Sequence, residues 1–127
     1  MTYDTVPISN GVALQDASSI KITNGGRYMI NATFLLRNTG VSDGVTDVWM
    51  NVNGAYVNNS ARMWDVPGTE DVVTLAYTNM YDFDADDILQ FAWYSPEPGV
   101  QMPTIIPAGD PERPVKPAAM VQVYKIA

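Results

Sequence analysis

Four aspartates gather within a short segment of the chain: Asp82, Asp84, Asp86 and Asp87. Carboxylate oxygens at alternate positions are typical of the start of a calcium-binding loop. The glycine and the closing glutamate of such a loop have no counterparts, because the twelfth position of the loop falls on Trp93. We therefore favour a solvated turn before a strand and expect no metal. If an ion does bind, Asp82, Asp84 and Asp86 are its candidate ligands.

The residues that most often carry catalysis are missing, since the sequence contains no histidine and no cysteine. The usual general base, the thiolate nucleophile and the usual zinc ligands are therefore absent from the sequence. Its 14 acidic residues permit some carboxylate pair, but no spacing among them selects one for hydrolysis. No glycine-rich phosphate loop occurs either. We expect no catalytic residue, no cofactor and no enzyme activity.

The three tryptophans are candidates for a platform on which sugars stack. Trp49 and Trp93 lie in alternating patterns typical of strands, so we expect both in the core. Trp64 lies in the segment SARMWDVPG, which we expect to be a connection, and it is the better candidate for exposure. A tryptophan in a tight turn usually caps the end of a core, and this interpretation is favoured over a sugar site.

Strands must position these residues, because period-two alternation dominates the chain and no ten-residue stretch has helical periodicity. The predicted strands span residues 19–23, 26–37, 45–52, 55–58, 72–80, 87–94 and 119–126. The turn Asn24-Gly25-Gly26 predicts a hairpin between the first two strands. Asn53-Gly54 predicts a second hairpin through a type I′ turn. The expected fold class is therefore all-β, a sandwich or a barrel.

The length and charge of the chain limit its partners. Its 127 residues fit one domain, and the apolar fraction of 46% with 17% charged residues is typical of globular proteins. The net charge is -7, whereas proteins that neutralise phosphates or approach anionic lipids do so with positively charged surfaces. We expect neither nucleic acid nor a membrane as a partner.

The segment of residues 96–117 is the most unusual part of the sequence, because it holds seven of the nine prolines and lacks alternation. Connections longer than about 12 to 15 residues are uncommon in compact domains and are often functional. The favoured interpretation is a proline-stiffened crossover between two strands, and the alternative is an arm that docks on a neighbouring subunit. The candidate partner-contact residues of this loop are Pro103, Ile105, Ile106 and Pro107.

The strand pattern also resembles a known superfamily. The segments GRYMINATFLL, VWMNVNGAYVNNS and FDADDILQFAW, with a final apolar strand, resemble the tumour necrosis factor and complement globular-head superfamily over residues 20–126. The resemblance implies a jelly-roll sandwich of two antiparallel sheets that assembles as a homotrimer. Residues 18–127 would form this jelly roll, and residues 1–17 an N-terminal arm or an edge strand.

The resemblance implies that Tyr28, Ile30, Ala32 and Phe34 face the core. Six residues are expected at the trimer interface, the first three from the resemblance and the last three by alternation: Met29, Asn31, Thr33, Met120, Gln122 and Tyr124. Both strands carry uncharged, partly apolar residues on both faces, whereas a sheet with one wet face alternates apolar with polar residues. A subunit interface would supply the second buried surface, because obligate interfaces resemble a domain core. In the alternative, Met29 and Tyr124 lie under the proline-rich loop of the same chain.

Two classes of function fit such a trimer. The first is a virion structural protein, similar to phage capsid decoration proteins or fibre heads. It would lie on the capsid surface and bridge capsomers, and its partners would be its own copies and the major capsid protein or another virion protein. The second is a receptor- or glycan-binding head of a tail fibre or of a secreted, extracellular complement-like protein. No collagen-like or coiled-coil stalk occurs in the sequence, which favours the decoration role.

Overall fold

A computed structural model describes residues 12–16, 19–40, 42–68, 72–102 and 119–127 of the chain. The described residues form ten β-strands and no helix: β1 (Val12–Asp16), β2 (Ser19–Ile22), β3 (Gly26–Asn38), β4 (Gly44–Val52), β5 (Ala55–Tyr56), β6 (Arg62–Val66), β7 (Val72–Phe83), β8 (Ile88–Tyr94), β9 (Val100–Gln101) and β10 (Ala119–Lys125). This part of the chain has no helix that could cross a membrane. The predicted all-β class is confirmed.

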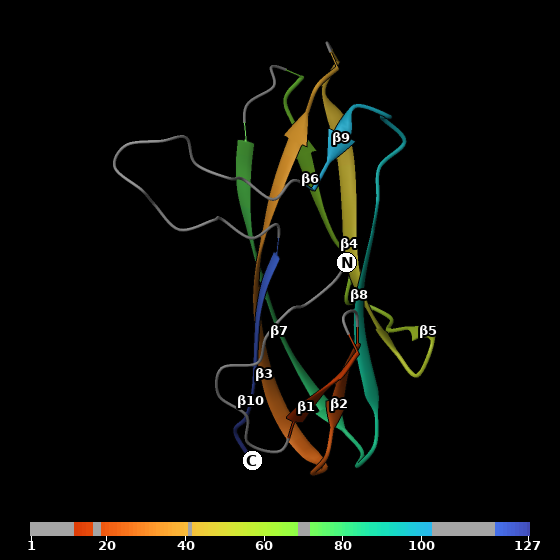
Figure 1. Cartoon of the computed structure of the whole chain (residues 1–127), viewed down its shortest axis with the longest axis vertical. Helices are drawn as coiled ribbons and strands as arrows, with labels where there is room; N and C mark the ends of the chain where they lie inside the picture. Colours follow the sequence, from red (N-terminus) through yellow and green to blue (C-terminus); the bar gives the residue numbers. More distant parts are fainter. Residues whose placement is uncertain (1–11, 17–18, 41, 69–71, 103–118) are drawn as a thin grey trace, which may run out of the picture.

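The strands form two antiparallel sheets, which make up the two layers of a β-sandwich (Figure 1). The six-stranded sheet has the order β1-β2-β8-β4-β5, and β6 also pairs with β4. The four-stranded sheet has the order β10-β3-β7, and β9 also pairs with β3. In Figure 1, β10, β3 and β7 lie on the left and β8, β4 and β5 lie on the right. Strand β1 is an edge strand of the six-stranded sheet, whereas residues 1–11 of the expected arm lie outside the described residues.

The core lies between the two sheets and is centred on β3, the longest strand. From Tyr28 onward every second residue of β3 is buried, including the four that were expected in the core: Tyr28, Ile30, Ala32 and Phe34. The ring of Phe34 meets Tyr77 of β7 at 6.4 Å and Phe91 of β8 at 5.6 Å between centroids, with the rings edge to face. The two sheets are therefore joined by interlocked aromatic rings, a geometry that adds stability beyond the buried area.

The two predicted hairpins have different outcomes. The turn at Asn53-Gly54 does join paired strands, β4 and β5, with φ of 52° at Asn53 and 82° at Gly54. Positive φ at both central residues matches the type I′ geometry, so this prediction is confirmed. The hairpin at Asn24-Gly25-Gly26 is wrong, because β2 belongs to the six-stranded sheet and β3 to the four-stranded sheet. The turn is real, but Ile22 and Tyr28 bury their side chains in the core from opposite layers.

Candidate functional site

The six residues predicted for the trimer interface lie on two paired strands, β3 and β10. The register pairs Met29 with Tyr124, Asn31 with Gln122, and Thr33 with Met120. The alternate residues of β3 are buried, and Val121 and Val123 of β10 pack against the core. Because successive side chains of a strand point to opposite sides, all six lie together on the outer face of the four-stranded sheet.

Strand β7 extends this surface on the other side of β3. Three rows of residues cross β10, β3 and β7, and we call them the uncharged face: Tyr124, Met29 and Met80; Gln122, Asn31 and Thr78; Met120, Thr33 and Ala76. Sequence reasoning missed the three residues from β7, because it did not show that β7 pairs with β3. Their common phase in VVTLAYTNM was the available signal, since Leu75 and Tyr77 of the other phase are buried.

Asn31 lies at the centre of the uncharged face and links its first and middle rows. Its side-chain amide donates a hydrogen bond to the hydroxyl of Tyr124, with 3.4 Å between Nδ2 and Oη. The hydroxyl of Thr78 donates to the amide oxygen of Asn31 at 3.2 Å. The amide therefore bridges β10 and β7 across β3, and three strands share one polar network on the outer face.

Large apolar side chains surround this polar centre and are half exposed. Met80 is 50% exposed, Met120 57% and Tyr124 47%. Scattered single apolar residues are ordinary on a protein surface, whereas adjoining ones often mark an interaction site. Here Met80 and Tyr124 lie in the first row of a single sheet face and Met120 lies in the third. The arrangement is suited to packing against another apolar surface.

Charged residues lie at the border of the uncharged face and not within it. Below its first row, Arg27 of β3 and Asp82 of β7 form an exposed ion pair with two hydrogen bonds, Nε to Oδ1 at 2.8 Å and Nη2 to Oδ2 at 3.2 Å. The hydrogen bond from Arg27 lowers the pKa of the Asp82 carboxyl below its ordinary value of 3.8. A shallow hollow of about 230 Å³ lies beside this pair. The nine residues of the rows include no Asp, Glu, Lys or Arg.

The aspartates that were considered as metal ligands contact different partners. Asp82 is part of β7 and binds Arg27, while Asp86 faces Lys21, with 3.4 Å between Oδ1 and Nζ. Among the described residues no group of three acidic side chains could hold a metal ion. The turn itself lies at residues 84–87, where Asp87 accepts a hydrogen bond from the backbone N–H of Asp84 at 2.8 Å. Asp82, Asp84 and Asp86 are therefore not brought together, and Asp82 does not belong to the turn.

The prediction for Trp49 is wrong, whereas that for Trp64 is wrong about the connection and right about its contact with the core. Trp49 lies on the outer face of the six-stranded sheet, because its neighbours Val48 and Met50 are the buried ones. Its phase is shared with the polar residues Asp47 and Asn51, and this was the signal in the sequence that we missed. Trp64 lies in strand β6 rather than in a connection, and it packs against the core. Trp93 also packs against the core, as expected.

The proposed partner-contact residues Pro103, Ile105, Ile106 and Pro107 lie outside the described residues. The site that the structure presents is therefore the uncharged face. No family model and no curated protein matches this chain. The resemblance to the tumour necrosis factor superfamily thus stays a prediction from the strand pattern.

Proposed function

We propose that this chain is a virion structural protein that forms a homotrimer through the uncharged face and stabilises a capsid by bridging neighbouring capsomers. The proposal includes a jelly-roll connection of the sandwich, as in the tumour necrosis factor superfamily. One observation carries it: a contiguous outer face of three strands combines half-exposed Met80, Met120 and Tyr124 with no charged side chain.

The uncharged face is where a second copy of this acidic chain can pack without burying a charged side chain. Each chain carries a net charge of -7, so copies repel one another at long range. Burying an unpaired carboxylate or ammonium group in a contact would cost several kcal/mol more. The uncharged face avoids this cost, because it leaves the ion pair of Arg27 and Asp82 at its border. Depletion of charge at the centre is also the compositional mark of protein interfaces.

The middle row supports a symmetric arrangement. Asn31 and Gln122 pair across β3 and β10, and each amide carries both donors and an acceptor. An amide near a threefold axis can therefore donate to one symmetry copy of itself and accept from the other. A charged residue at the same place would meet two like charges. The uncharged amides are thus compatible with three copies around one axis.

The capsid contacts would come from elements that lie away from the threefold axis of the trimer. In this proposal residues 1–17 and the loop with Pro103, Ile105, Ile106 and Pro107 clamp the capsomers. A decoration trimer would sit at threefold points of the shell. Its partners would be its own copies and the major capsid protein, and its location would be the capsid surface of a virion.

Mass in solution tests the trimer first. Sedimentation equilibrium of the full chain at micromolar concentration should give three times the chain mass of 13.9 kDa. A stable, folded species with the mass of one chain would overturn the proposal, because the uncharged face would then be exposed to solvent in the folded protein.

Binding to shells tests the capsid role. Purified protein is mixed with undecorated capsids, and bound protein is measured by co-sedimentation and cryo-electron microscopy. We expect saturation in threefold units and a shell that resists heat or chelation better than the bare shell. A trimer that binds no capsid, but binds a cell-surface receptor, would contradict the decoration role and support the fibre-head alternative.

A further inference from the structure

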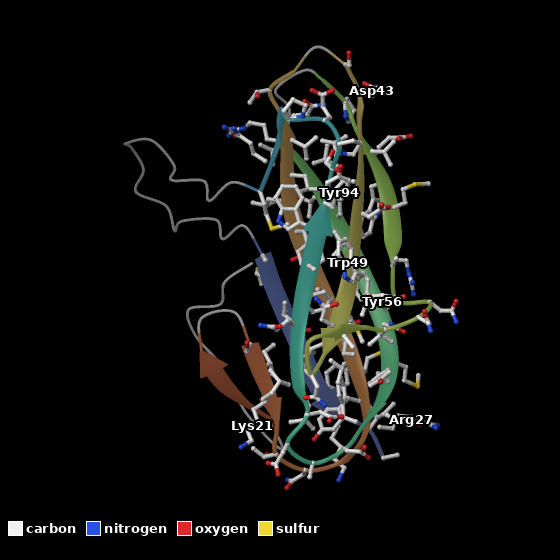
Figure 2. The ribbon with its side chains drawn as sticks, turned by 90° about the vertical axis from the view of Figure 1, so that its right-hand side faces the viewer. Lys21, Arg27, Asp43, Trp49, Tyr56 and Tyr94 are labelled. Atoms are coloured by element: carbon white, nitrogen blue, oxygen red, sulfur yellow. The ribbon has the colours of Figure 1, made fainter. Side chains whose placement is uncertain are left out.

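A recess lies on the opposite layer of the sandwich, on the outer face of the six-stranded sheet. It has a volume of about 330 Å³ and is lined by Trp49 of β4, Tyr56 of β5 and four residues of the connection to β6: Val57, Asn58, Asn59 and Ala61. We call it the Trp49 recess. Figure 2 looks onto this layer and shows Trp49 and Tyr56 close together on it. The uncharged face is on the other sheet, so a trimer formed through that face leaves the recess open.

The connection that forms one wall of the recess is held by a buried network. The hydroxyl of Ser60 accepts a hydrogen bond from the backbone N–H of Met50 at 3.1 Å and donates to the carbonyl of Val57 at 2.7 Å. The hydroxyl of Tyr77 donates to the carbonyl of Ser60 at 2.5 Å. Arg62 donates to the carbonyls of Asn59 and Ala61. The wall is therefore rigid before any ligand arrives, which lowers the entropic cost of binding.

The aromatic side chains of the recess are placed for stacking. Trp49 donates a hydrogen bond from its indole nitrogen to Asn51 at 3.2 Å, which fixes the orientation of the ring. Tyr56 is 73% exposed, a high value for a large aromatic side chain. The face of an aromatic ring carries partial negative charge and attracts C–H groups with partial positive charge. The apolar face of a sugar ring presents such C–H groups.

The polar residues of the lining can form hydrogen bonds with the hydroxyl groups of a sugar. Asn58 and Asn59 are exposed, and their side-chain amides form no hydrogen bond within the described residues. Each amide offers both a donor and an acceptor, the combination that pairs with neighbouring hydroxyl groups. None of the lining residues is charged, and the net charge of -7 repels anions. The chemistry favours a neutral ligand.

We propose that the Trp49 recess binds a neutral carbohydrate, with the sugar ring stacked on Trp49 or Tyr56 and its hydroxyls bonded to Asn58 and Asn59. The site is independent of the capsid role, because it needs neither the uncharged face nor a capsid partner. The recess volume is at the low end of ligand pockets, which span about 300 to 1,000 Å³. A single sugar unit should therefore bind weakly, with a Kd of about 1 mM.

An array of neutral oligosaccharides, with sialylated and sulfated glycans included, tests the proposal with the full-length protein. The neutral glycans that bind are then titrated in solution and followed by amide NMR shifts and tryptophan fluorescence. Glucose, galactose and N-acetylglucosamine are titrated in parallel to about 50 mM, well above the expected Kd. We expect saturable shifts at the residues of the recess and a change in the emission of Trp49.

Two variants locate the site, and one serves as a matched control. Tyr56→Ala should weaken binding about tenfold without unfolding the protein, because its side chain is exposed. Trp49→Ala should abolish the stacking contribution and the fluorescence change. Tyr94→Ala removes an aromatic residue that is 58% exposed on the same outer face but does not line the recess, and it should bind as the unmodified protein does.

Three outcomes would overturn the proposal. The first is the absence of saturable binding to any neutral glycan or monosaccharide. The second is binding to acidic glycans alone, which would place a cationic site elsewhere on the chain. The third is binding that Tyr56→Ala and Trp49→Ala leave unchanged while circular dichroism shows all variants folded. Failure of the trimer test, by contrast, leaves these results unaffected.

Discussion

The outer faces of the two sheets expose apolar side chains to a similar degree but differ in charge. On the six-stranded sheet Tyr94 is 58% exposed and Met63 is 69% exposed, and both are paired in register with Asp47. On the four-stranded sheet Met120 is 57% exposed and Tyr124 is 47% exposed, and their partners in register are Thr33 and Met29. Exposure alone therefore does not separate the two faces.

The neighbours of an exposed apolar residue decide what can cover it. A partner that covered Tyr94 would also desolvate Asp47, and Asp65 lies on the same outer face beside Val45. Desolvating an unpaired carboxylate costs several kcal/mol. A partner that covered Tyr124 would bury amides and hydroxyls, which hydrogen-bond readily across a contact. The first face is therefore suited to water or a small ligand, and the second to another protein surface.

A glutamate placed on each face gives the largest expected difference. Tyr124→Glu adds a carboxylate to the first row of the proposed interface, so association of subunits should weaken by several kcal/mol. Sedimentation equilibrium should then show single chains or aggregates. Tyr94→Glu makes the same change on the six-stranded sheet and should leave the mass of the assembly unchanged. A trimer that tolerates Tyr124→Glu as well as Tyr94→Glu would exclude the uncharged face as the interface.

Removal of the Ser60 hydroxyl tests whether hydrogen bonds within one chain stabilise the wall of the Trp49 recess. Ser60→Ala leaves the buried N–H of Met50 without its acceptor, so the free energy of unfolding should fall by about 1 to 3 kcal/mol. The loss should be the same at every protein concentration, because the network joins residues of one chain. Chemical denaturation at two protein concentrations measures this.

Ser95→Ala is the matched control for the Ser60 variant. Its hydroxyl donates to the carbonyl of Val45 at 2.8 Å, a hydrogen bond exposed to solvent, and accepts a longer, half-buried one from the backbone N–H of Glu97 at 3.3 Å. Water can replace the lost partner, so stability should change by less than about 0.5 kcal/mol. Equal losses for both serine variants would mean that the connection at residues 57–61 does not depend on the buried network.

Substitution of one asparagine on each face compares the contributions of their polar groups to stability. Asn31→Ala removes the link between Tyr124 and Thr78, and in a trimer it also leaves these hydroxyls covered and unpaired. We expect a loss of about 1 kcal/mol per subunit, with a melting temperature that depends on protein concentration. Asn51→Ala removes the acceptor of Trp49 on the wet face and should change stability by less than about 0.5 kcal/mol. Concentration-independent melting of Asn31→Ala would contradict the trimer.

Local patterns predicted the parts of the fold that depend on one strand. Alternation marked β3 as a strand, the resemblance implied which of its two phases faces the core, and alternation added the outward set on β10. The Asn53-Gly54 hairpin also followed, since its backbone geometry is encoded by two adjacent residues.

The parts that depend on pairing between distant strands could not be predicted in this way. Asn24-Gly25-Gly26 encodes a bend, but the choice between a hairpin and a passage to the other sheet depends on where β2 and β8 meet. The contribution of Met80 to the uncharged face required the pairing of β7 with β3. Strand β6 was missed because RMWDV alternates over only five residues, and its pairing with β4 decides its structure.

The border of the uncharged face should respond to pH, with the smallest effect of the series. Arg27 stabilises the charged form of Asp82, so the pKa of this carboxyl lies below 3.8 in the folded chain. The contribution of the pair is thus fully present above the unfolded pKa and is lost as the pH falls through the lowered, folded pKa. Because both side chains are exposed, this contribution is small. Titration of the Asp82 carboxyl by NMR should show the lowered pKa, and Arg27→Gln should return it toward 3.8.

The same titration separates the border of the face from its centre. Arg27 and Asp82 belong to one chain, so their coupling should survive in the Tyr124→Glu variant even when that variant is monomeric. A pKa of Asp82 that rises to its ordinary value in Tyr124→Glu would instead mean that the pair depends on a neighbouring subunit. The interface would then extend over the ion pair, and its rim would contain charge that the three central rows lack.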